Sequence, residues 1–305
     1  MFFAGGDHVK RLLKIIGIVI LAALLLFLIL FFWHFPRYLR RGTPVAVAPE
    51  EGKNVIMGYN LRCIAPEDLG RKSWFYRAEL VLSDIQKEKP GIIGFQEATW
   101  VHYNYLVKAL PEYDSVITYR DDFVLSEGCP IFYNKDLYTL RNKGSFWLSE
   151  TPEVQSKDWG AACYRICSYV ILTDNSTGED FVVFNTHLDH ISDEARIKGM
   201  NVVLDRIAQF GGIPAVLMGD LNAEEDSATI QAATGYFLDA RYAAPETKDS
   251  YTYQNWGNMA KAVRIDYFMI SKEGIEPVCY DVLTETHDGV YSSDHCPILL
   301  EFRLN

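Results

Sequence analysis

Nineteen consecutive uncharged residues near the start of the chain limit most strongly what it can fold into. Residues 15–33 have the sequence IIGIVILAALLLFLILFFW. As a helix rising about 1.5 Å per residue, this segment would extend roughly 28 Å, close to the hydrocarbon thickness of a bilayer. A buried core helix is the alternative. Apolar residues on every face and basic residues at both ends favour a membrane span.

The flanks of this segment favour an anchor that is not cleaved. The segment exceeds the apolar part of a usual signal peptide, and the nearby small-residue site at 46–48 is followed by Pro49, which fits cleavage poorly. We therefore expect a basic tail at residues 1–14, a single transmembrane helix at 15–33, and a linker at 34–53, where prolines and glycines break a helix. Three basic residues flank the helix on each side. This balance leaves the orientation open, with an extracytoplasmic body as the expectation.

Charge is distributed unevenly along the chain. Residues 1–41 carry six basic and one acidic side chain, a net charge of +5, while the remainder carries 23 basic and 39 acidic side chains, a net charge of −16. A body this acidic repels the phosphate backbone of long nucleic acids unless bound cations mask it. Nucleic acid therefore stays an alternative partner that the charge disfavours, and the sequence indicates no protein partner.

The remaining composition is that of a globular protein. Hydrophobic residues make up 49% and charged residues 23% of the chain, which excludes disorder and coiled coil. Its six cysteines include no C-x-x-C pair, so neither a disulfide scaffold nor a zinc or thiol redox site is indicated. After the linker there is no internal repeat, and we expect one domain at residues 54–305.

Short β-rich runs in this domain alternate with helical segments. Strands are expected at 54–62, 91–97, 130–133, 169–173, 181–186, 215–219, 265–270 and 298–302, and helices at 73–87, 100–110 and 192–210. Asn175–Gly178 lies between two of these strands and predicts a hairpin over residues 169–186. The fold class is therefore α/β, and a purely parallel sheet is not expected because hairpins are present.

Polar residues recur where these apolar strands begin or end. They are Asn60, Glu97, His187, Asp220, Asn222, Asp266, Asp294 and His295. Each has an ordinary explanation on its own, such as a helix cap, a solvated loop or a structural histidine. Strands that finish in carboxylates, amides and imidazoles tend to gather these groups at one edge of a sheet, where a cleft can form. Their convergence is the functional signal.

Six short motifs in order resemble those of the endonuclease/exonuclease/phosphatase superfamily, whose fold is that of deoxyribonuclease I. The motifs are NVIMGYN at 54–60, IGFQE at 93–97, NTHLDH at 185–190, MGDLN at 218–222, RIDY at 264–267 and SSDHCP at 292–297. The match spans roughly residues 54–305. Segments 146–152 and 165–167 look most like the bacterial members. The resemblance implies a four-layered sandwich of two mixed β-sheets flanked by helices, with a divalent-metal site at one edge and phosphoester hydrolysis as the activity.

The resemblance also implies roles for the polar residues. Mg²⁺, or Mn²⁺ in its place, would be held by Glu97, with Asn60 and Asp294 in contact with the cation or with its other ligands, since oxygen ligands suit such cations. Asp220 would orient or deprotonate the attacking water, and Asn222 would hold that water or a phosphoryl oxygen. His295 would stabilise the developing charge, Asp266 would keep His295 charged and oriented, and His187 corresponds to a second active-site histidine.

Three further residues are candidates for supporting roles. In deoxyribonuclease I a glutamate partners the second histidine, and Glu127 lies in the corresponding stretch here, with a loop carboxylate as the alternative. Arg165 can clamp a phosphate with two parallel hydrogen bonds, with a surface ion pair as the alternative. Asp189 shares the face of His187 on an alternating strand end, whereas His190 does not.

These observations together predict a metal-dependent phosphoester hydrolase tethered to a membrane. Motifs of serine hydrolases, P-loop enzymes and HExxH metalloproteases are absent from the sequence. The expected substrate is a lipid headgroup or another small phosphoester. A nuclease is the first alternative. A catalytically inactive, membrane-tethered binding module is the second, although a binding module needs no complete set of acid, base and metal-binding groups.

Overall fold

The computed structural model describes the backbone of residues 5–39, 43–50 and 52–305. The chain divides between Arg41 and Gly42 into two compact units. Helix α1, Gly5–Leu39, contains the predicted segment 15–33. Within it, His8–Ile29 has a mean hydropathy of 3.1 and is long and apolar enough to cross a membrane, and none of this span is buried inside the protein. The helix continues through Pro36 and ends at Leu39, so the helix break expected at residue 34 is not observed. A proline so close to a helix end disrupts few helical hydrogen bonds.

Part of the predicted linker belongs to the larger unit. The Val45 N–H donates to the Ala109 carbonyl at 2.9 Å, and the Val47 side chain is buried in the core. The folded unit therefore begins before residue 54, the boundary that the sequence suggested.

Two mixed sheets form the centre of the larger unit. The first has seven strands in the order β10 (Glu246–Lys248), β12 (Ile275–Val282), β13 (Ile298–Leu304), β1 (Asn54–Asn60), β2 (Ile92–Gln96), β4 (Ile131–Asn134) and β3 (Tyr113–Val116). The second has six in the order β5 (Tyr138–Trp147), β6 (Ile166–Asp174), β7 (Asp180–His187), β8 (Ala215–Asp220), β11 (Asp266–Ser271) and β9 (Phe237–Asp239). The pairs β1/β2, β7/β8 and β10/β12 are parallel and the others antiparallel, which confirms a mixed architecture.

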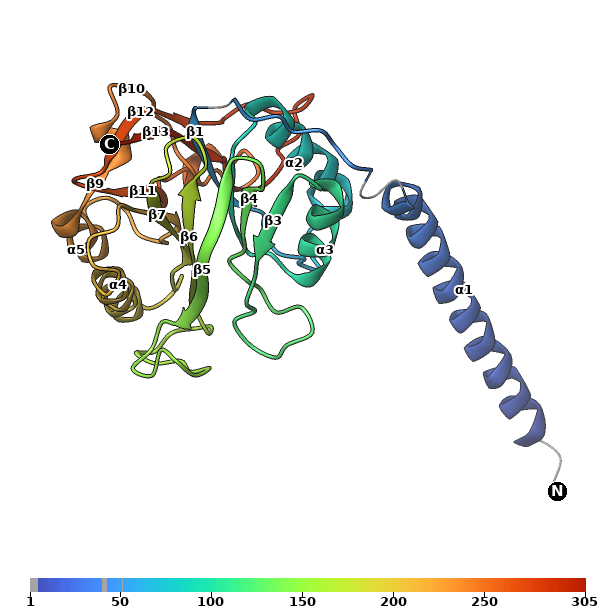
Figure 1. Ribbon diagram of the computed structural model, residues 1–305. Coiled ribbons are helices and arrows are strands. Elements are labelled where there is room, and N and C mark those ends of the chain that lie inside the picture. Colours follow the sequence, from blue (N-terminus) through green and yellow to red (C-terminus); the bar gives the residue numbers. More distant parts are fainter. Residues whose placement is uncertain (1–4, 40–42, 51) are drawn as a thin grey trace. The chain divides into compact units, whose positions relative to one another are not determined.

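Helices cover both outer faces of the sheet pair (Figure 1). The larger unit contains α2 (Trp74–Glu88), α3 (Trp100–Ala109), α4 (Asp193–Ala208), α5 (Ala228–Tyr236), the short α6 (Ala240–Ala243), and the 3₁₀ turns η1 (Gly70–Lys72) and η2 (Met259–Lys261). Figure 1 shows α2 and α3 beside the first sheet, and α4 and α5 beside the second. Side chains fix two of the helix starts. Ser192 accepts the Ala195 N–H and Ser227 accepts the Ile230 N–H, each satisfying a donor that the helix itself cannot bond.

Alternation along the central strands builds three hydrophobic layers. On β1, Ile56 packs between the two sheets and Met57 packs toward α2 and α3. On β8, Val216 packs between the sheets, whereas Leu217 joins the layer that includes residues of α4 and α5. Successive strand residues point to opposite faces, so one strand supplies two layers. The result is the four-layered sandwich that the resemblance implied.

All eight predicted strands and three predicted helices are present. Strands β3, β5, β9, β10 and β12 and helices α5 and α6 were not predicted from the sequence. Most positions of β5 are at least partly exposed, and β12 contains Pro277 beside a bulge, so neither shows a clear apolar run. The hairpin between β6 and β7 is confirmed. Its turn is closed by a hydrogen bond from the Gly178 N–H to the Asp174 carbonyl at 2.7 Å, and Gly178 has a φ of 78°, which glycine adopts readily.

Candidate active site

Polar side chains converge at one edge of the sheet pair. Asn60 ends β1, Glu97 follows β2, His187 ends β7, Asp220 ends β8 and Asp266 begins β11. His187 and Asp220 are register partners across β7 and β8, and Asp220 and Asp266 are partners across β8 and β11. The predicted convergence of strand ends is therefore present in this fold.

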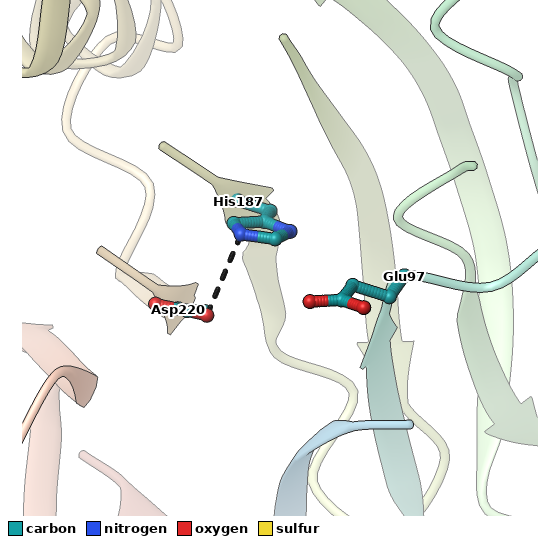
Figure 2. A group of neighbouring side chains, drawn as sticks. All are labelled: Glu97, His187 and Asp220. Carbon is teal, nitrogen blue, oxygen red and sulfur yellow. Dashed lines mark ion pairs between the residues drawn. The ribbon is translucent and has the colours of Figure 1, made fainter. Parts of the chain in front are cut away.

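The centre of this edge is the group formed by Glu97, His187 and Asp220 (Figure 2). One potential ligand atom from each lies within 4.8 Å of the others, and His187 Nε2 is 3.4 Å from Asp220 Oδ2. Asn60 joins the two carboxylates, because its Nδ2 donates to Glu97 Oε1 at 3.1 Å and to Asp220 Oδ2 at 3.0 Å. Its Oδ1 accepts the Arg62 N–H at 2.9 Å. Asn60 therefore holds the carboxylates together through its amide nitrogen, while its amide oxygen accepts one backbone N–H and has a second lone pair.

The backbone at Glu97 aims its carboxylate at the group. Its φ of 58° is left-handed, which is uncommon for a residue with a side chain and is often found at functional sites. Glu97 Oε2 accepts the Cys63 N–H at 2.6 Å. Burial opposes the charged form, but this hydrogen bond, the positive charge of His295 and the Asn60 amide outweigh it and lower the pKa of Glu97. The carboxylate is therefore ionised at neutral pH.

Asp266 and His295 form a buried pair, as the resemblance implied. His295 Nδ1 and Asp266 Oδ2 are 2.9 Å apart, and His295 Nε2 is 3.7 Å from Asp220 Oδ2. Burial alone would favour the neutral imidazole, but the Asp266 carboxylate reverses this and raises the pKa of His295 to about 10. His295 is therefore a fixed positive charge at neutral pH, with Nε2 as the donor that Asp266 leaves unused.

Asp220 and Asn222 follow each other at the end of β8. The Asn222 N–H donates to Asp220 Oδ1 at 2.9 Å, and Asn222 Nδ2 donates to the Leu188 carbonyl at 3.0 Å. Burial and the negative charge of Asp266 raise the pKa of Asp220 to about 7. A carboxylate with this pKa is well matched to accept a proton near neutral pH.

Asp294 lies on the same side of the site as Arg62. The side chain of Asp294 is buried, and its Oδ2 is 3.9 Å from Arg62 Nη1. Burial raises the pKa of Asp294. The residue borders the cavity but is not part of the group around Glu97.

These residues surround a cavity of about 460 Å³. This volume lies within the range of roughly 300–1,000 Å³ that is usual for small-molecule sites. The lining residues are Arg62, Cys63, Glu97, Arg120, Glu127, Cys163, Arg165, His187, His190, Asp220, Asn222, Tyr253, Ile265, Asp294 and His295. Of the predicted site residues, only Asn60, Asp189 and Asp266 are outside this lining, and all three contact residues that belong to it.

Glu127 does not have the partner that the resemblance suggested. Its Oε1 accepts a hydrogen bond from Arg120 Nη2 at 2.8 Å, whereas the carboxylate beside His187 belongs to Asp220. Burial and the negative charge of Glu97 raise the pKa of Glu127 to about 7. Glu127 therefore lines the cavity as the partner of an arginine.

His190, and not Asp189, borders the cavity. Asp189 turns into the protein, where its carboxylate accepts the backbone N–H groups of residues 162, 163, 191 and 192. The strand ends at His187, so the alternation used in the prediction no longer applies two residues later. Arg165 is buried and lines the cavity, which contradicts the alternative of a surface ion pair.

Sequence reasoning did not single out several lining residues. Arg62 follows the motif residue Asn60 by two positions, and His190 is the last residue of the motif at 185–190, although Asp189 was preferred to it. Arg120 lies far from every motif and has no such signal. It reaches the cavity because Trp147 Nε1, at the end of β5, donates to the Arg120 carbonyl at 2.9 Å and holds that loop.

The chemistry of the donor set fits a divalent cation. Glu97 and Asp220 offer carboxylate oxygens and His187 offers an imidazole nitrogen. Burial and the positive charges of Arg165 and Arg120 lower the pKa of His187 well below its usual range, and the resulting neutral imidazole is the form that binds metals. Oxygen ligands suit Mg²⁺, and an added imidazole is compatible with Mn²⁺. A second group, Asp220, Asp266 and His295, contains a histidine that is already charged and hydrogen-bonded.

Comparison with known proteins agrees with this geometry. A model of the endonuclease/exonuclease/phosphatase family matches residues 33–295, which is most of the chain. The chain belongs to this family. Its members are generally hydrolases that act on phosphoesters and use divalent metal ions.

Solved structures of family members share the fold. A family protein from Bacteroides vulgatus is 29% identical and superimposes with a TM-score of 0.79. The match covers 84% of this chain and 100% of the chain of that protein. A mannosyl-6-phosphatase from Bacteroides thetaiotaomicron is 30% identical, covers 82% of this chain and 100% of its own, and has a TM-score of 0.76. The human Nocturnin catalytic domain with bound sulfate, at 19% identity and a TM-score of 0.66, shares the fold and covers 83% of this chain and 94% of its own.

Two curated relatives each match about half of this chain. An uncharacterised protein of Acanthamoeba polyphaga mimivirus is 28% identical over 162 residues, which is 60% of its length. Nocturnin of Drosophila melanogaster is 29% identical over 167 residues, which is 24% of its length. This chain therefore matches less than two thirds of either relative.

Proposed function

We propose that this protein is a divalent-metal-dependent hydrolase of small phosphoesters that α1 holds at a membrane. One observation carries the proposal. Glu97, His187 and Asp220 form a group able to bind a cation, and the charged Asp266–His295 pair lies 3.7 Å from the same Asp220 oxygen, beside a cavity of about 460 Å³. A pure binding module has no need for this combination of base, fixed cation and metal-binding groups.

Each side chain has a chemical task in this proposal. A bound divalent cation would offset the negative charge of the phosphoryl group. Glu97, Asp220 and His187 would hold the cation. Asp294 lines the same cavity and is an additional carboxylate at the site. Asp220 would also accept the proton of the attacking water, as the resemblance implies.

His295 and Asn222 complete the site. His295 Nε2 donates to a phosphoryl oxygen as charge develops there, and Asp266 holds the imidazole in its charged form. Asn222 is fixed by two hydrogen bonds beside the base and is placed to hold the water or a phosphoryl oxygen.

A small phosphoester is favoured over a nucleic acid. The body carries 39 acidic and 23 basic side chains, which weakens binding to long polyanions. A relative with 30% identity over 82% of this chain is a mannosyl-6-phosphatase, which supports a phosphorylated sugar or a similar small ester as substrate. A lipid headgroup is the other source of such an ester, because α1 is suited to keep the protein at a bilayer.

The test is hydrolysis by the full chain in a non-ionic detergent. Para-nitrophenyl phosphate and its bis-ester serve as generic substrates, with Mg²⁺, with Mn²⁺ or with EDTA. We expect turnover only with a divalent cation, and a fall in kcat/KM of about 10²- to 10⁴-fold in Asp220→Ala and His295→Ala. Glu246→Ala, at an exposed position of β10, is the matched control and keeps full activity.

Three outcomes separate the alternatives. Equal background turnover in all variants would support an inactive binding module. Efficient cleavage of DNA or RNA at physiological salt would support a nuclease. A panel of mannose 6-phosphate, nucleotides, phosphoinositides and sphingomyelin then ranks the small esters by kcat/KM.

A further inference from the structure

One wall of the cavity carries basic side chains that have no step of their own in the proposed reaction. This cationic wall consists of Arg120, Arg165 and His190, all of which line the cavity. Arg120 and Arg165 also border a smaller recess together with Glu97 and His187. Within residues 43–50 and 52–305, no hydrogen bond joins the wall to Asp220, Asp266 or His295. The wall is therefore a separate set of donors beside the metal-binding group.

Arg165 is buried without a carboxylate at hydrogen-bond distance. Its side chain is 6% exposed, and its Nε has no hydrogen-bond partner among the described residues. The Asp189 carboxylate is 3.7 Å away, and four backbone N–H groups already bond to it. A buried charge without a close partner is costly, and such a cost is usually retained for a purpose.

Two other buried arginines in the same fold make close hydrogen bonds to protein oxygens. Arg264 makes a two-pronged pair with Asp239 at 2.7 and 2.8 Å. The guanidinium of Arg77, which is completely buried, donates to four backbone carbonyls, at residues 61, 62, 72 and 292. Both are structural arginines, although the buried Nε of Arg264 also has no hydrogen-bond partner among the described residues. Arg165 differs from them because it lines the cavity and, among the described residues, makes no hydrogen bond to a carboxylate or a carbonyl.

Arg120, which lines the same cavity, has a second unsatisfied donor. Its Nη2 donates to Glu127, whereas its buried Nε has no hydrogen-bond partner among the described residues. The nearest Asp121 oxygen is 3.9 Å from Nε. The Arg120 N–H donates to the Glu127 carbonyl, and the Arg120 carbonyl accepts a hydrogen bond from Trp147 Nε1. These bonds fix the backbone position of Arg120.

His190 adds a third donor. Arg165 Nη2 lies 2.9 Å from His190 Nδ1. Because an arginine can only donate, Nδ1 must accept, and a neutral His190 then carries its hydrogen on Nε2. Two guanidinium groups and one imidazole N–H are a donor set that suits the oxygens of a phosphate or carboxylate.

We propose that the cationic wall binds a second oxyanion of the substrate, a phosphate or carboxylate distinct from the phosphoryl group that is cleaved. That the bound anion is part of a substrate rests on the proposed function, whereas the anion-binding site itself does not. The donors of the wall adjoin the cation-binding group, since Arg120 and Arg165 share a recess with Glu97 and His187, and the cavity of about 460 Å³ has room for more than one phosphate-sized group. The substrate class becomes a small phosphoester that carries a further negative group.

The first experiment measures binding of inorganic phosphate to the full chain in EDTA and non-ionic detergent by isothermal titration calorimetry. Without a cation, the carboxylates of the metal-binding group repel an anion, so phosphate reports on the cationic wall. We expect Arg165→Met and Arg120→Met each to weaken binding about tenfold or more, since each removes a charged donor. Arg165→Lys, which keeps the charge but not the planar fork, is expected to fall between Arg165→Met and the wild type.

Matched variants make the result decisive. Glu127→Gln removes the carboxylate that competes for Arg120, and we expect it to strengthen phosphate binding severalfold. Arg141→Met, at an exposed position of β5, leaves binding unchanged. His295→Ala also retains binding if the wall is the site. Loss of binding in His295→Ala together with unchanged binding in Arg165→Met and Arg120→Met would overturn the inference.

The second experiment identifies the source of the oxyanion. With Mg²⁺, kcat/KM is compared for 3-phosphoglycerate against glycerol 3-phosphate, and for fructose 1,6-bisphosphate against fructose 6-phosphate. In at least one pair, we expect the wild type to prefer the compound with a second anionic group. We expect Arg165→Met to reduce that preference about tenfold or more. Absence of any preference in the wild type, or an unchanged preference in Arg165→Met and Arg120→Met, contradicts the inference. Absence of all hydrolysis would refute the proposed function alone, because the calorimetry still decides the anion site.

Discussion

Two histidines of the candidate site face the same oxygen and have opposite charge states. His187 Nε2 and His295 Nε2 lie 3.4 and 3.7 Å from Asp220 Oδ2. Burial disfavours the charged form of both. Asp266 overcomes this for His295 and raises its pKa to about 10, whereas Arg165 adds to the effect of burial at His187 and lowers its pKa. The different charged neighbours of the two rings therefore make His295 a fixed cation and His187 a neutral ligand.

The pH behaviour of His295 follows from this pair. The pKa of about 10 lies above the usual value near 6.5, so the folded state holds this proton more tightly than the unfolded chain. The stabilisation is complete below about pH 6.5 and is lost as the pH rises through about 10. In EDTA, NMR titration of the His295 ring should show an alkaline midpoint, and Asp266→Asn should move it toward neutral pH.

A control for this titration is available elsewhere in the fold. Asp84 Oδ1 lies 2.7 Å from His287 Nε2. Asp84→Asn removes that carboxylate and should leave the midpoint of His295 unchanged. A midpoint of His295 near 6.5 in the wild type would contradict the assignment of a charged imidazole at neutral pH.

Among single residues, the sequence predicted the Asp266–His295 contact and the convergence on Glu97 and Asp220. It misplaced Asp189, which accepts backbone N–H groups behind the cavity, and it gave Glu127 the wrong partner. Motif residues at strand ends inherit their positions from the sheets. Loop residues do not, because a loop's path depends on what it packs against.

At the scale of elements, the register of three strands aligns the site. His187, Asp220 and Asp266 occupy neighbouring register positions on β7, β8 and β11. Gly219 makes this possible, because a Cβ there would lie 1.9 Å from the Thr186 carbonyl oxygen and its φ is 144°. Only glycine combines such an approach with such a backbone conformation.

Gly219→Ala is therefore expected to reduce both stability and activity. The clash is with backbone atoms, so β7 and β8 must move apart at the edge that carries the candidate site. We expect the free energy of unfolding to fall by roughly 1–3 kcal/mol or more. Urea unfolding of the soluble fragment 43–305 measures the loss, and hydrolysis of para-nitrophenyl phosphate by the full chain measures the effect on the site.

Gly235→Ala is the matched control. This glycine lies near the end of α5, has no heavy atom within 4 Å of an added Cβ, and does not need a positive φ. Alanine should raise the free energy of unfolding by up to about 1 kcal/mol because it favours helix. Equal stability of the Gly219→Ala variant and the wild type would show that the strands accommodate the methyl group.

At the scale of the whole molecule, the folded unit includes part of the predicted linker. Val47 is 3% exposed and packs with residues of α2 and α3. A fragment that starts at residue 54 loses this contact and the hydrogen bond from Val45 to Ala109. We expect fragment 54–305 to be about 1.5–3 kcal/mol less stable than fragment 43–305 in urea unfolding. Val47→Ala in the longer fragment should reproduce part of this loss, and equal stability of the two fragments would contradict it.

The N-terminal unit makes its own prediction. A helix with a span of mean hydropathy 3.1 should partition irreversibly into a bilayer. We expect the full chain to sediment with membranes after washes in high salt and in alkaline carbonate, and to be released only by detergent. Fragment 43–305 should stay in the supernatant. Release of the full chain by salt alone would exclude a spanning anchor.

The amino-acid sequence by itself determined the features that depend on local chemistry and periodicity. These are the apolar helix, the strands with buried alternation, the hairpin at residues 169–186 and the polar residues at strand ends. Only the tertiary structure decided what faces the cavity from the loops, including Arg120, His190 and the unsatisfied donor of Arg165. Strand periodicity places a residue on one face of a sheet from its immediate neighbours alone. A loop side chain takes its direction from contacts with distant segments, such as the hydrogen bond of Trp147 to Arg120, and no local pattern records them.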